Sequence, residues 1–292
     1  MSIPSVRLHR DMPDGLRDRI RVVLVQPSHP GNVGACARAM RVMGLRRLVL
    51  VDPVRADVLH DSQARALSSG AADVLDAARV CASLDEALAD VTLAVAISAD
   101  AREFGPPLCD PDAACAAVVD ELQQADAHQV ALVFGPERTG LSITDAGRCQ
   151  LLCAIPGESD YNSLNLAQAV QVIAYELRRT VMRRVPADAA GAGMAVRSDV
   201  DVEAGADVGA AAGDPTATVR APQQDVEQFF QHFERALVRI GFLDPAHPKK
   251  LMARLRRLFG RARLEVDEVR LLRGLCRLIE SPQPPRQGRP GS

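Results

Sequence analysis

The sequence contains no tryptophan, and aromatic residues make up only 3% of its 292 residues. This scarcity disfavours a surface that binds nucleic acid by stacking bases on interleaved aromatic rings. The net charge is −2, so the chain as a whole is not a basic nucleic-acid-binding protein. No apolar run reaches the roughly 18 residues that a membrane-spanning helix needs. Because the first residues also lack an apolar secretion signal, we expect a cytoplasmic protein with no membrane contact.

The seven cysteines are scattered along the chain, as expected for a cytoplasmic protein. Cys149 and Cys153 lie four residues apart, but no CxxC pair and no histidine partner stands nearby. We therefore expect no metal site, and we expect most of these cysteines to be small core residues. Two nucleotide-binding motifs are also missing, because no Gly-Lys-Ser/Thr phosphate loop and no G-x-G-x-x-G after a strand occur.

Residues 21–185 alternate short apolar runs with segments of helical length. The runs are rich in Val, Leu and Ile and hardly alternate with polar residues, which is typical of strands buried on both faces. The predicted strands lie in Arg21–Pro27, Leu45–Pro53, Thr92–Ser98, Gln129–Gly135 and Leu151–Gly157. The predicted helices are Val33–Met43, Ser62–Ser69, Leu84–Ala89, Asp112–Ala125 and Leu164–Arg184. This alternation predicts an α/β domain with a mostly parallel sheet, preceded by a tail over residues 1–20.

The character of the chain changes at residue 186. Residues 186–222 are dominated by Ala, Gly, Asp and Val, with six acidic residues against two arginines, which predicts a disordered linker. Apolar residues spaced three to four apart then predict a small helical extension over residues 223–281, followed by a tail over 282–292. From Ala246 to Ser292 there are twelve Lys or Arg residues and four Asp or Glu, a net charge of +8. These arginines indicate either an RNA- or DNA-binding accessory or the solvated face of a small bundle.

Ligands in parallel α/β sheets bind at the carboxyl ends of the strands, and several of those ends here are polar or glycine-rich. In PGNVGACARAMRVMGL, Asn32 is placed to cap a helix, and Gly34 sits in the first turn, where it would let a neighbour approach closely. Arg38 lies one turn beyond Gly34 on the same face. In LVFGPERTGLS, two glycines bracket Glu137 and Arg138 at a strand end, which favours a functional loop over an ordinary turn.

The stretch SDYNSLNLAQAVQVIAYELRR places Asn162, Ser163 and Asn165 at the start of a helix, more polar groups than one cap requires. The three segments, in this order and at these separations, resemble the three motifs of the SpoU-like branch of the SPOUT class of RNA 2′-O-ribose methyltransferases. The resemblance covers about residues 21–184 and is closest to the bacterial tRNA methyltransferases that modify the first nucleotide of the anticodon loop, nucleotide 32. It implies a C-terminal trefoil knot, a homodimer and an S-adenosyl-L-methionine pocket.

Carried over residue by residue, the resemblance implies two groups of site residues. The cofactor would be bound by Ile97, Ser98, Ala99, Gly135, Ile155, Asn162, Ser163 and Leu164. The family often has Thr where this chain has Ile97, which matters little if the contact is through the backbone. The catalytic group would comprise Arg38, Asn32, Glu137 and Asn165, the last three orienting the nucleotide or holding the loops.

Arg38 matches the arginine that is proposed as the general base in the family. A free guanidinium stays protonated, so we expect Arg38 to bind the phosphate next to the target ribose and to stabilise the developing alkoxide. Two alternatives remain at this stage. A non-catalytic RNA-binding protein on the same scaffold would be expected to lose the motif arginine or glycine, whereas this chain keeps both. A methyltransferase of ribosomal RNA or of another tRNA site would keep the same residues.

Overall fold

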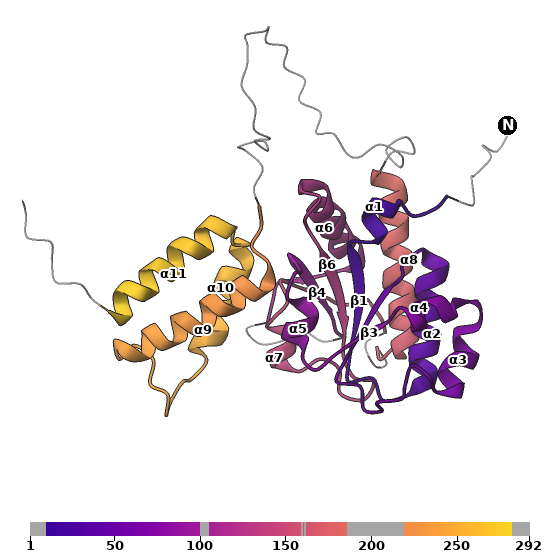
Figure 1. The fold of residues 1–292 in the computed structure, drawn as a ribbon, viewed down its shortest axis with the longest axis horizontal. Helices are drawn as coiled ribbons and strands as arrows, with labels where there is room; N and C mark the ends of the chain where they lie inside the picture. The colour runs from indigo at the N-terminus through magenta and orange to yellow at the C-terminus, as the bar shows by residue number, and fades with distance from the viewer. Residues whose placement is uncertain (1–9, 100–104, 159, 161, 186–218, 282–292) are drawn as a thin grey trace, which may run out of the picture.

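The computed structural model describes residues 10–99, 105–158, 160, 162–185 and 219–281. A seven-stranded sheet lies between helices, and a separate group of three helices packs at one side of this unit (Figure 1). The strand order is β3-β2-β1-β6-β4-β7-β5, and each neighbouring pair is parallel. The predicted α/β fold with a mostly parallel sheet is therefore confirmed.

The central strands are buried over most or all of their length, as their uninterrupted apolar runs predict. Two strands were not expected from the sequence. They are the short edge strands β3 and β5, whose three and two residues give no periodic signal. The strand bounds are β1 Ile20–Val25, β2 Arg47–Val51, β3 Arg79–Cys81, β4 Leu93–Ile97, β5 Leu108–Cys109, β6 Val130–Phe134 and β7 Leu151–Cys153.

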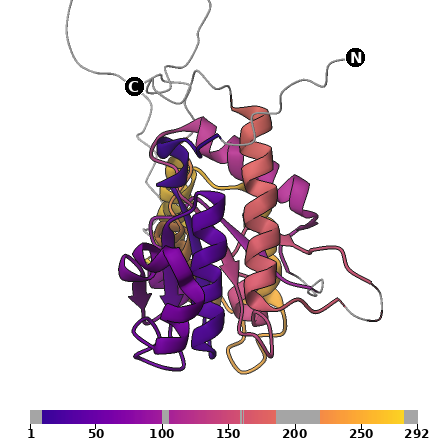
Figure 2. The same cartoon turned by 90° about the vertical axis from the view of Figure 1, so that its right-hand side faces the viewer.

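Alternate residues of the strands face two separate apolar cores. The larger core lies under α2, α6 and α8, and the smaller one lies under α5 and α7. Helices α2 and α8 run alongside each other over the same face of the sheet (Figure 2). The helices and helical turns of this unit are α1 Asp14–Arg17, α2 Pro30–Met43, α3 Ser62–Ser68, η1 Ser69–Ala71, α4 Ala72–Asp76, α5 Leu84–Leu88, α6 Pro111–Gln124, α7 Ile143–Ala146 and α8 Leu166–Arg184.

The packed unit begins before Arg21, inside the segment that we expected to be a tail. Met12 and Leu16 are only 2% and 3% exposed and belong to the larger core. The guanidinium of Arg10 donates a hydrogen bond of 2.8 Å to the carbonyl oxygen of Val185, so the start of the described chain is held against the end of α8. The sequence shows no periodic pattern here because α1 has only four residues.

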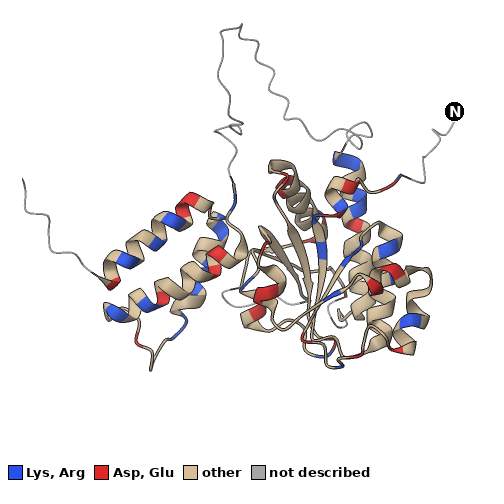
Figure 3. Ribbon diagram, in the orientation of Figure 1, with Lys and Arg blue, Asp and Glu red and all other residues tan. Residues whose placement is uncertain are grey.

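The C-terminal helices are α9 Gln223–Arg239, α10 Leu251–Ala262 and α11 Val266–Glu280, in agreement with the predicted helical extension. Their core is centred on Phe229 and Phe230, with the ring of Phe259 packed edge-on against both. Basic residues are spread along α10 and α11 (Figure 3). Most of the predicted linker and the final tail lie outside the described residues. None of the helices in the described ranges is long and apolar enough to cross a membrane.

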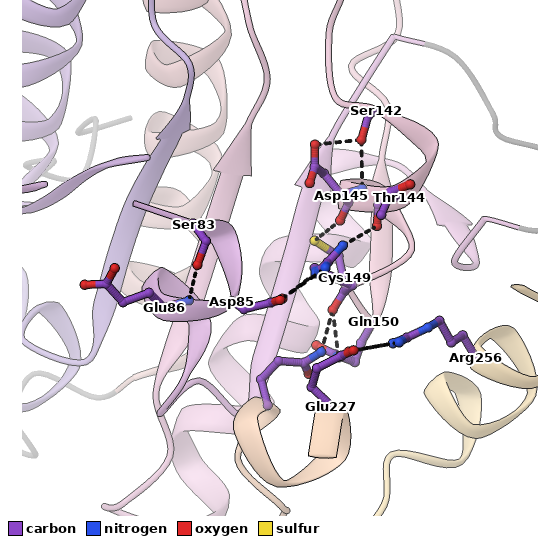
Figure 4. A network of polar contacts seen from close by, with 12 residues as sticks. Ser83, Asp85, Glu86, Ser142, Thr144, Asp145, Cys149, Gln150, Glu227 and Arg256 are labelled. Atoms are coloured by element: carbon purple, nitrogen blue, oxygen red, sulfur yellow. Dashed lines mark hydrogen bonds and ion pairs between the residues drawn. The ribbon is translucent and has the colours of Figure 1, made fainter. Parts of the chain in front are cut away.

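The C-terminal helices are docked on the sheet unit through the start of α9. The backbone nitrogen of Gln223 donates to the carbonyl oxygen of Val91 at 2.8 Å, and its side-chain oxygen accepts from Gln150 Nε2, also at 2.8 Å. Figure 4 shows Gln150 beside the ion pair between Glu227 and Arg256, which joins α9 to α10. The two units therefore share a polar interface in addition to the covalent connection.

Candidate active site

A cavity of about 260 Å³ opens at the carboxyl ends of β4, β6 and β7. Its wall is formed by the loops that follow these strands and by the start of α8, the position where parallel sheets bind ligands. The residues that the sequence predicted to bind a cofactor are all brought together in this wall: Ile97, Ser98, Ala99, Gly135, Ile155, Asn162, Ser163 and Leu164. Pro136, Arg138, Thr139 and Gly140 of the predicted functional loop also line the cavity, and so do Phe134, Leu166 and Ala169, which sequence reasoning missed.

The loop after β6 is closed by its glycines. A Cβ atom on Gly135 would lie 2.2 Å from the backbone nitrogen of Leu141, so only glycine lets the loop fold back on its own start. Gly140 has φ +63°, and its nitrogen donates to the carbonyl oxygen of Pro136 at 2.9 Å. The two glycines that bracket the Glu-Arg pair in the sequence are thus requirements of a tight loop that exposes backbone to the cavity.

The cavity wall combines apolar side chains with loop backbone. Leu164 is 43% exposed, which is unusual for a leucine beside a core helix and leaves its side chain available to an apolar ligand face. Ile155 packs at the edge of the larger core and contributes a second apolar surface. Apolar faces next to backbone donors and acceptors suit a planar base such as adenine, so these residues fit the adenosyl group that the sequence resemblance implies.

Glu137 is the centre of a hydrogen-bond network at the edge of this cavity. Its side chain is only 11% exposed, and it accepts from Ser28 Oγ at 2.9 Å and from Asn32 Nδ2 at 3.0 Å. The backbone nitrogens of Ser28 and His29 add contacts of 3.1 and 3.2 Å. Burial raises the pKa of this carboxyl, but the hydrogen bonds from Asn32 and Ser28 outweigh burial and leave the pKa below its ordinary value. Glu137 is therefore an ionised anchor for the start of α2.

Asn32 links the first motif to the third. Its Oδ1 accepts from Asn165 Nδ2 at 3.0 Å, while Asn165 Oδ1 accepts from the backbone nitrogen of Ala167 at 2.9 Å. Asn165 is the N-cap of α8 and forms a capping box with Gln168, so the helix begins at Leu166, not at Leu164 as predicted. The chain Glu137–Asn32–Asn165 thus joins all three motifs.

Of the two predicted roles in the first motif, the capping role of Asn32 is wrong and the close approach at Gly34 is confirmed. Asn32 is not a helix cap, because α2 begins at Pro30 and its N-cap is His29, whose side chain makes no capping bond. The space beside Gly34 is filled by the protein itself, since a Cβ there would lie 2.0 Å from the carbonyl oxygen of Ala64 in α3. Gly34 therefore permits the close packing of two helices, and no ligand needs to approach its backbone.

Arg38 stands apart from the cavity. It is exposed on α2, does not line the cavity wall and has no hydrogen-bond or ion-pair partner among the described residues. Arg41, one turn further on, is paired with Asp73 at 3.0 Å. The structure thus brings Asn32, Glu137 and Asn165 together. The fourth predicted catalytic residue, Arg38, lies on the surface of α2 away from them.

The described residues contain no group of three or more His, Cys, Asp or Glu side chains that is suited to hold a metal ion. The cysteines described in the structure are free thiols, most of them buried as predicted. Burial raises the pKa of Cys115 and Cys149 to about 12, so these two thiols stay protonated and inert near neutral pH.

Comparison with known proteins agrees with this geometry. The family model of the SpoU rRNA methylases matches residues 19–175, and the model of the tRNA methyltransferase TrmJ C-terminal domain matches residues 224–289. A tRNA (cytidine/uridine-2′-O-)-methyltransferase TrmJ from Yersinia pestis (strain Pestoides F) is 43% identical over 89% of this chain and 91% of its own. A tRNA (cytidine/uridine/adenosine-2′-O-)-methyltransferase TrmJ from Pseudomonas aeruginosa (strain UCBPP-PA14) is 41% identical over 88% of this chain and 92% of its own.

The crystal structure of TrmJ from Z. mobilis ZM4 superposes with a TM-score of 0.70 at 27% identity, covering 89% of this chain and 99% of the other. The family match spans more than half of this chain, and the two curated relatives cover most of it. Both the catalytic fold and the helical extension are therefore shared with proteins of one kind. The chain belongs to the SpoU methylase family of RNA 2′-O-ribose methyltransferases.

Proposed function

We propose that the protein methylates the ribose 2′-hydroxyl of nucleotide 32 in the anticodon loop of tRNA, with S-adenosyl-L-methionine as methyl donor. The substrate is supported by the two TrmJ relatives, which are named as tRNA methyltransferases and match both units of this chain. The nucleotide is assigned from the resemblance of the three motifs to the enzymes of that position. The observation that carries the proposal is the cavity in which all eight predicted cofactor residues meet.

The cofactor would be held by backbone groups of the three loops and by the apolar side chains of Ile155 and Leu164. When bound, it supplies an electrophilic methyl group on a sulfonium centre. The tight loop closed by Gly135 keeps one wall of the cavity in place without a side chain. The family resemblance further implies a knot around this cavity and a homodimer that packs through it, and we include both in the proposal.

Arg38 is proposed to bind the substrate. A guanidinium that has no partner among the described residues can donate two parallel N–H hydrogen bonds from one edge to a phosphate, a bidentate contact. In this position it would orient the target ribose and stabilise the negative charge that develops on the 2′-oxygen. Its permanent charge makes it unsuited to accept the hydroxyl proton.

The helical extension is proposed to contact tRNA away from the reacting nucleotide. Residues 246–292 have a net charge of +8, and the match to the TrmJ C-terminal domain covers residues 224–289. Several of its arginines are already paired within the protein, for example Arg256 with Glu227 and Arg263 with Glu121. The exposed Arg257, Arg261 and Arg277 have no ion-pair partner among the described residues and are the ones we expect to contact phosphate groups.

One experiment tests the function. The purified protein is incubated with radiolabelled S-adenosyl-L-methionine and total tRNA from a strain that lacks this modification, and the methylated nucleotide is mapped. We expect label at the 2′-oxygen of nucleotide 32, and we expect Arg38→Lys to slow transfer strongly because lysine cannot bind phosphate in a bidentate manner. Label in ribosomal RNA but not in tRNA would contradict the substrate. Normal turnover of Arg38→Lys would contradict the bidentate role.

A further inference from the structure

Ser28, His29 and Glu137 form a chain of side-chain contacts beside the cavity. Ser28 Oγ lies 2.9 Å from Glu137 Oε2 and 2.8 Å from His29 Nδ1. His29 Nδ1 is itself 3.7 Å from Glu137 Oε1, so the ring stands next to a carboxylate. Since Glu137 also lines the cavity, this chain leads from the cavity wall to the surface, where the His29 side chain is 68% exposed.

The directions of these hydrogen bonds fix the tautomer of the imidazole. Glu137 is held ionised by its donors and can only accept, so it takes the single hydroxyl proton of Ser28. Ser28 Oγ then has only lone pairs to offer to His29, and the contact at 2.8 Å requires a proton on Nδ1. In the neutral ring the lone pair is therefore on Nε2.

Nε2 is the free end of this chain. Two groups of His29 are already engaged: its backbone nitrogen donates to Glu137 at 3.2 Å, and its Nδ1 contacts Ser28 Oγ. Although His29 is the N-cap of α2, its side chain makes no capping bond, and Nε2 has no partner among the described residues. The ring is thus held along one edge, beside the cavity-lining Glu137, and leaves an unprotonated nitrogen exposed to solvent.

The reaction of this family needs such a group. A ribose hydroxyl is a poor nucleophile, and its proton must leave as the oxygen bonds to carbon. Arg38 cannot take the proton, because a guanidinium remains charged. Glu137 has its oxygens occupied by donors from Ser28, His29 and Asn32. Among the described side chains around this network, the His29 imidazole is the one whose ring nitrogen, Nε2, is left without a hydrogen-bond partner.

Building on the proposed function, we propose that His29 is the general base of methyl transfer. The 2′-oxygen forms its bond to the methyl carbon, the bond from that carbon to sulfur breaks with its electron pair left on sulfur, and the hydroxyl proton moves to Nε2. The resulting imidazolium keeps its Nδ1 proton on Ser28 and is stabilised by the negative charge of Glu137. Ser28 and Glu137 are then positioning residues for the base.

Single-turnover methylation of tRNA tests this assignment in the full-length protein. His29→Gln should lower the rate about 100-fold or more, the usual contribution of a general base, while tRNA and cofactor affinities stay unchanged. In His29→Ala, added imidazole should restore part of the rate. His247→Gln is the matched control, because His247 is also exposed and hydrogen-bonded to a carboxylate, Asp244, yet lies in the helical extension. It should transfer methyl groups at the wild-type rate.

A second readout does not depend on activity. Nitrogen-15 NMR of the histidine rings, assigned with His29→Gln, should show the proton on Nδ1 in the wild type and a mixture of tautomers in Ser28→Ala. An Nε2-protonated ring in the wild type would overturn the proposal. So would a His29→Gln variant with wild-type single-turnover rate, or one whose loss of rate is fully explained by weaker tRNA binding. If the wild type itself does not methylate tRNA, the proposed function fails instead.

Discussion

At the scale of single residues, the side-chain amide of Asn165 makes two different hydrogen bonds, one through its oxygen and one through its nitrogen. Its oxygen caps α8, and its nitrogen donates to Asn32. Asn165→Asp keeps the oxygen and removes the donor, so we expect near wild-type thermal stability together with slower methyl transfer. Asn165→Ala removes both and should also lose about 1 kcal/mol of unfolding free energy. Thermal unfolding and single-turnover kinetics measure the two effects separately.

A matched control for this prediction is Ser83→Ala. Ser83 caps α5 by accepting from the backbone nitrogen of Glu86 at 3.2 Å, and α5 covers the other face of the sheet (Figure 4). This variant should lose stability without losing rate. A wild-type rate for Asn165→Asp would show that the bond between the first and third motifs is dispensable for catalysis.

The same residues show how far the sequence could predict the site. The local pattern predicted that the polar loops at the strand ends meet at one edge of the sheet, and the eight residues that the family resemblance assigned to the cofactor do line one cavity there. The partner of Asn32 could not be predicted, since Glu137 is 105 positions away and its carboxylate competes with the local capping role that asparagine normally has. A role for His29 could not be predicted either, because its contacts with Ser28 and Glu137 form only in the folded protein.

At the scale of secondary-structure elements, the packing of α2 against α3 depends on Gly34. A methyl group there would lie 2.0 Å from the backbone oxygen of Ala64, and neither helix can yield by rotating a side chain. We expect Gly34→Ala to destabilise the protein by about 1–3 kcal/mol or more, as overpacking does in a close contact. Thermal or urea-induced unfolding of the full-length protein measures this loss.

The control for Gly34 lies in the same unit. Gly15 in α1 has nothing within 4 Å of a built Cβ, so Gly15→Ala should leave stability unchanged or raise it by up to about 1 kcal/mol. If Gly34→Ala were as stable as Gly15→Ala, α2 and α3 would be able to move apart without a loss of unfolding free energy. In that case the close approach of α3 to α2 would not require a glycine at position 34.

Strands and helices were predicted correctly from the sequence where they are long and continuously buried, and they were missed where they are only a few residues long. β1, β4 and β6 are buried along their whole length, and their apolar runs predict them directly. β3 and β5 are edge strands of three and two residues whose pairing depends on tertiary position, not on composition. The short helix α7 has four residues and is likewise below the length at which a helical period is visible.

At the scale of the whole molecule, the helical extension is fixed to the catalytic unit by a buried ion pair. Glu121 on α6 is 2% exposed and lies 2.7 Å from Arg263, which also donates to the carbonyl oxygen of Thr92. Burial lowers the pKa of Arg263, and the charge of Glu121 offsets part of this effect. His128 completes the contact, with Nδ1 3.3 Å from Glu121 Oε1 and Nε2 accepting from the backbone nitrogen of Arg220.

The sequence predicted a basic helical extension behind a disordered linker, and this prediction rests on the composition of the linker. The docking contact could not be predicted in this way, because it depends on single residues far apart in the chain, such as Glu121 and Arg263 at a separation of 142 positions. A fixed extension has a consequence for function, because its arginines then keep a constant position relative to the cavity. Docking should therefore contribute to tRNA affinity through geometry as well as through charge.

Arg263→Met tests this arrangement by leaving Glu121 buried without its guanidinium. Breaking one partner of a buried pair costs about 3–5 kcal/mol, so we expect the extension to undock. Hydrogen–deuterium exchange should then accelerate at the start of α9, where the nitrogen of Gln223 is bonded to Val91, and tRNA affinity should fall. Adding Glu121→Gln to Arg263→Met should recover part of the protection, since the unpaired buried charge is removed.

The control for undocking is Arg270→Met, which removes the same positive charge from an exposed pair with Asp267 in α11. Exposed pairs contribute little to stability, so exchange at α9 should not change in this variant. A fall in tRNA affinity that is equal in Arg263→Met and Arg270→Met would attribute the effect to charge alone. A larger fall in Arg263→Met, partly recovered by Glu121→Gln, would show that the fixed position of the extension contributes to tRNA binding.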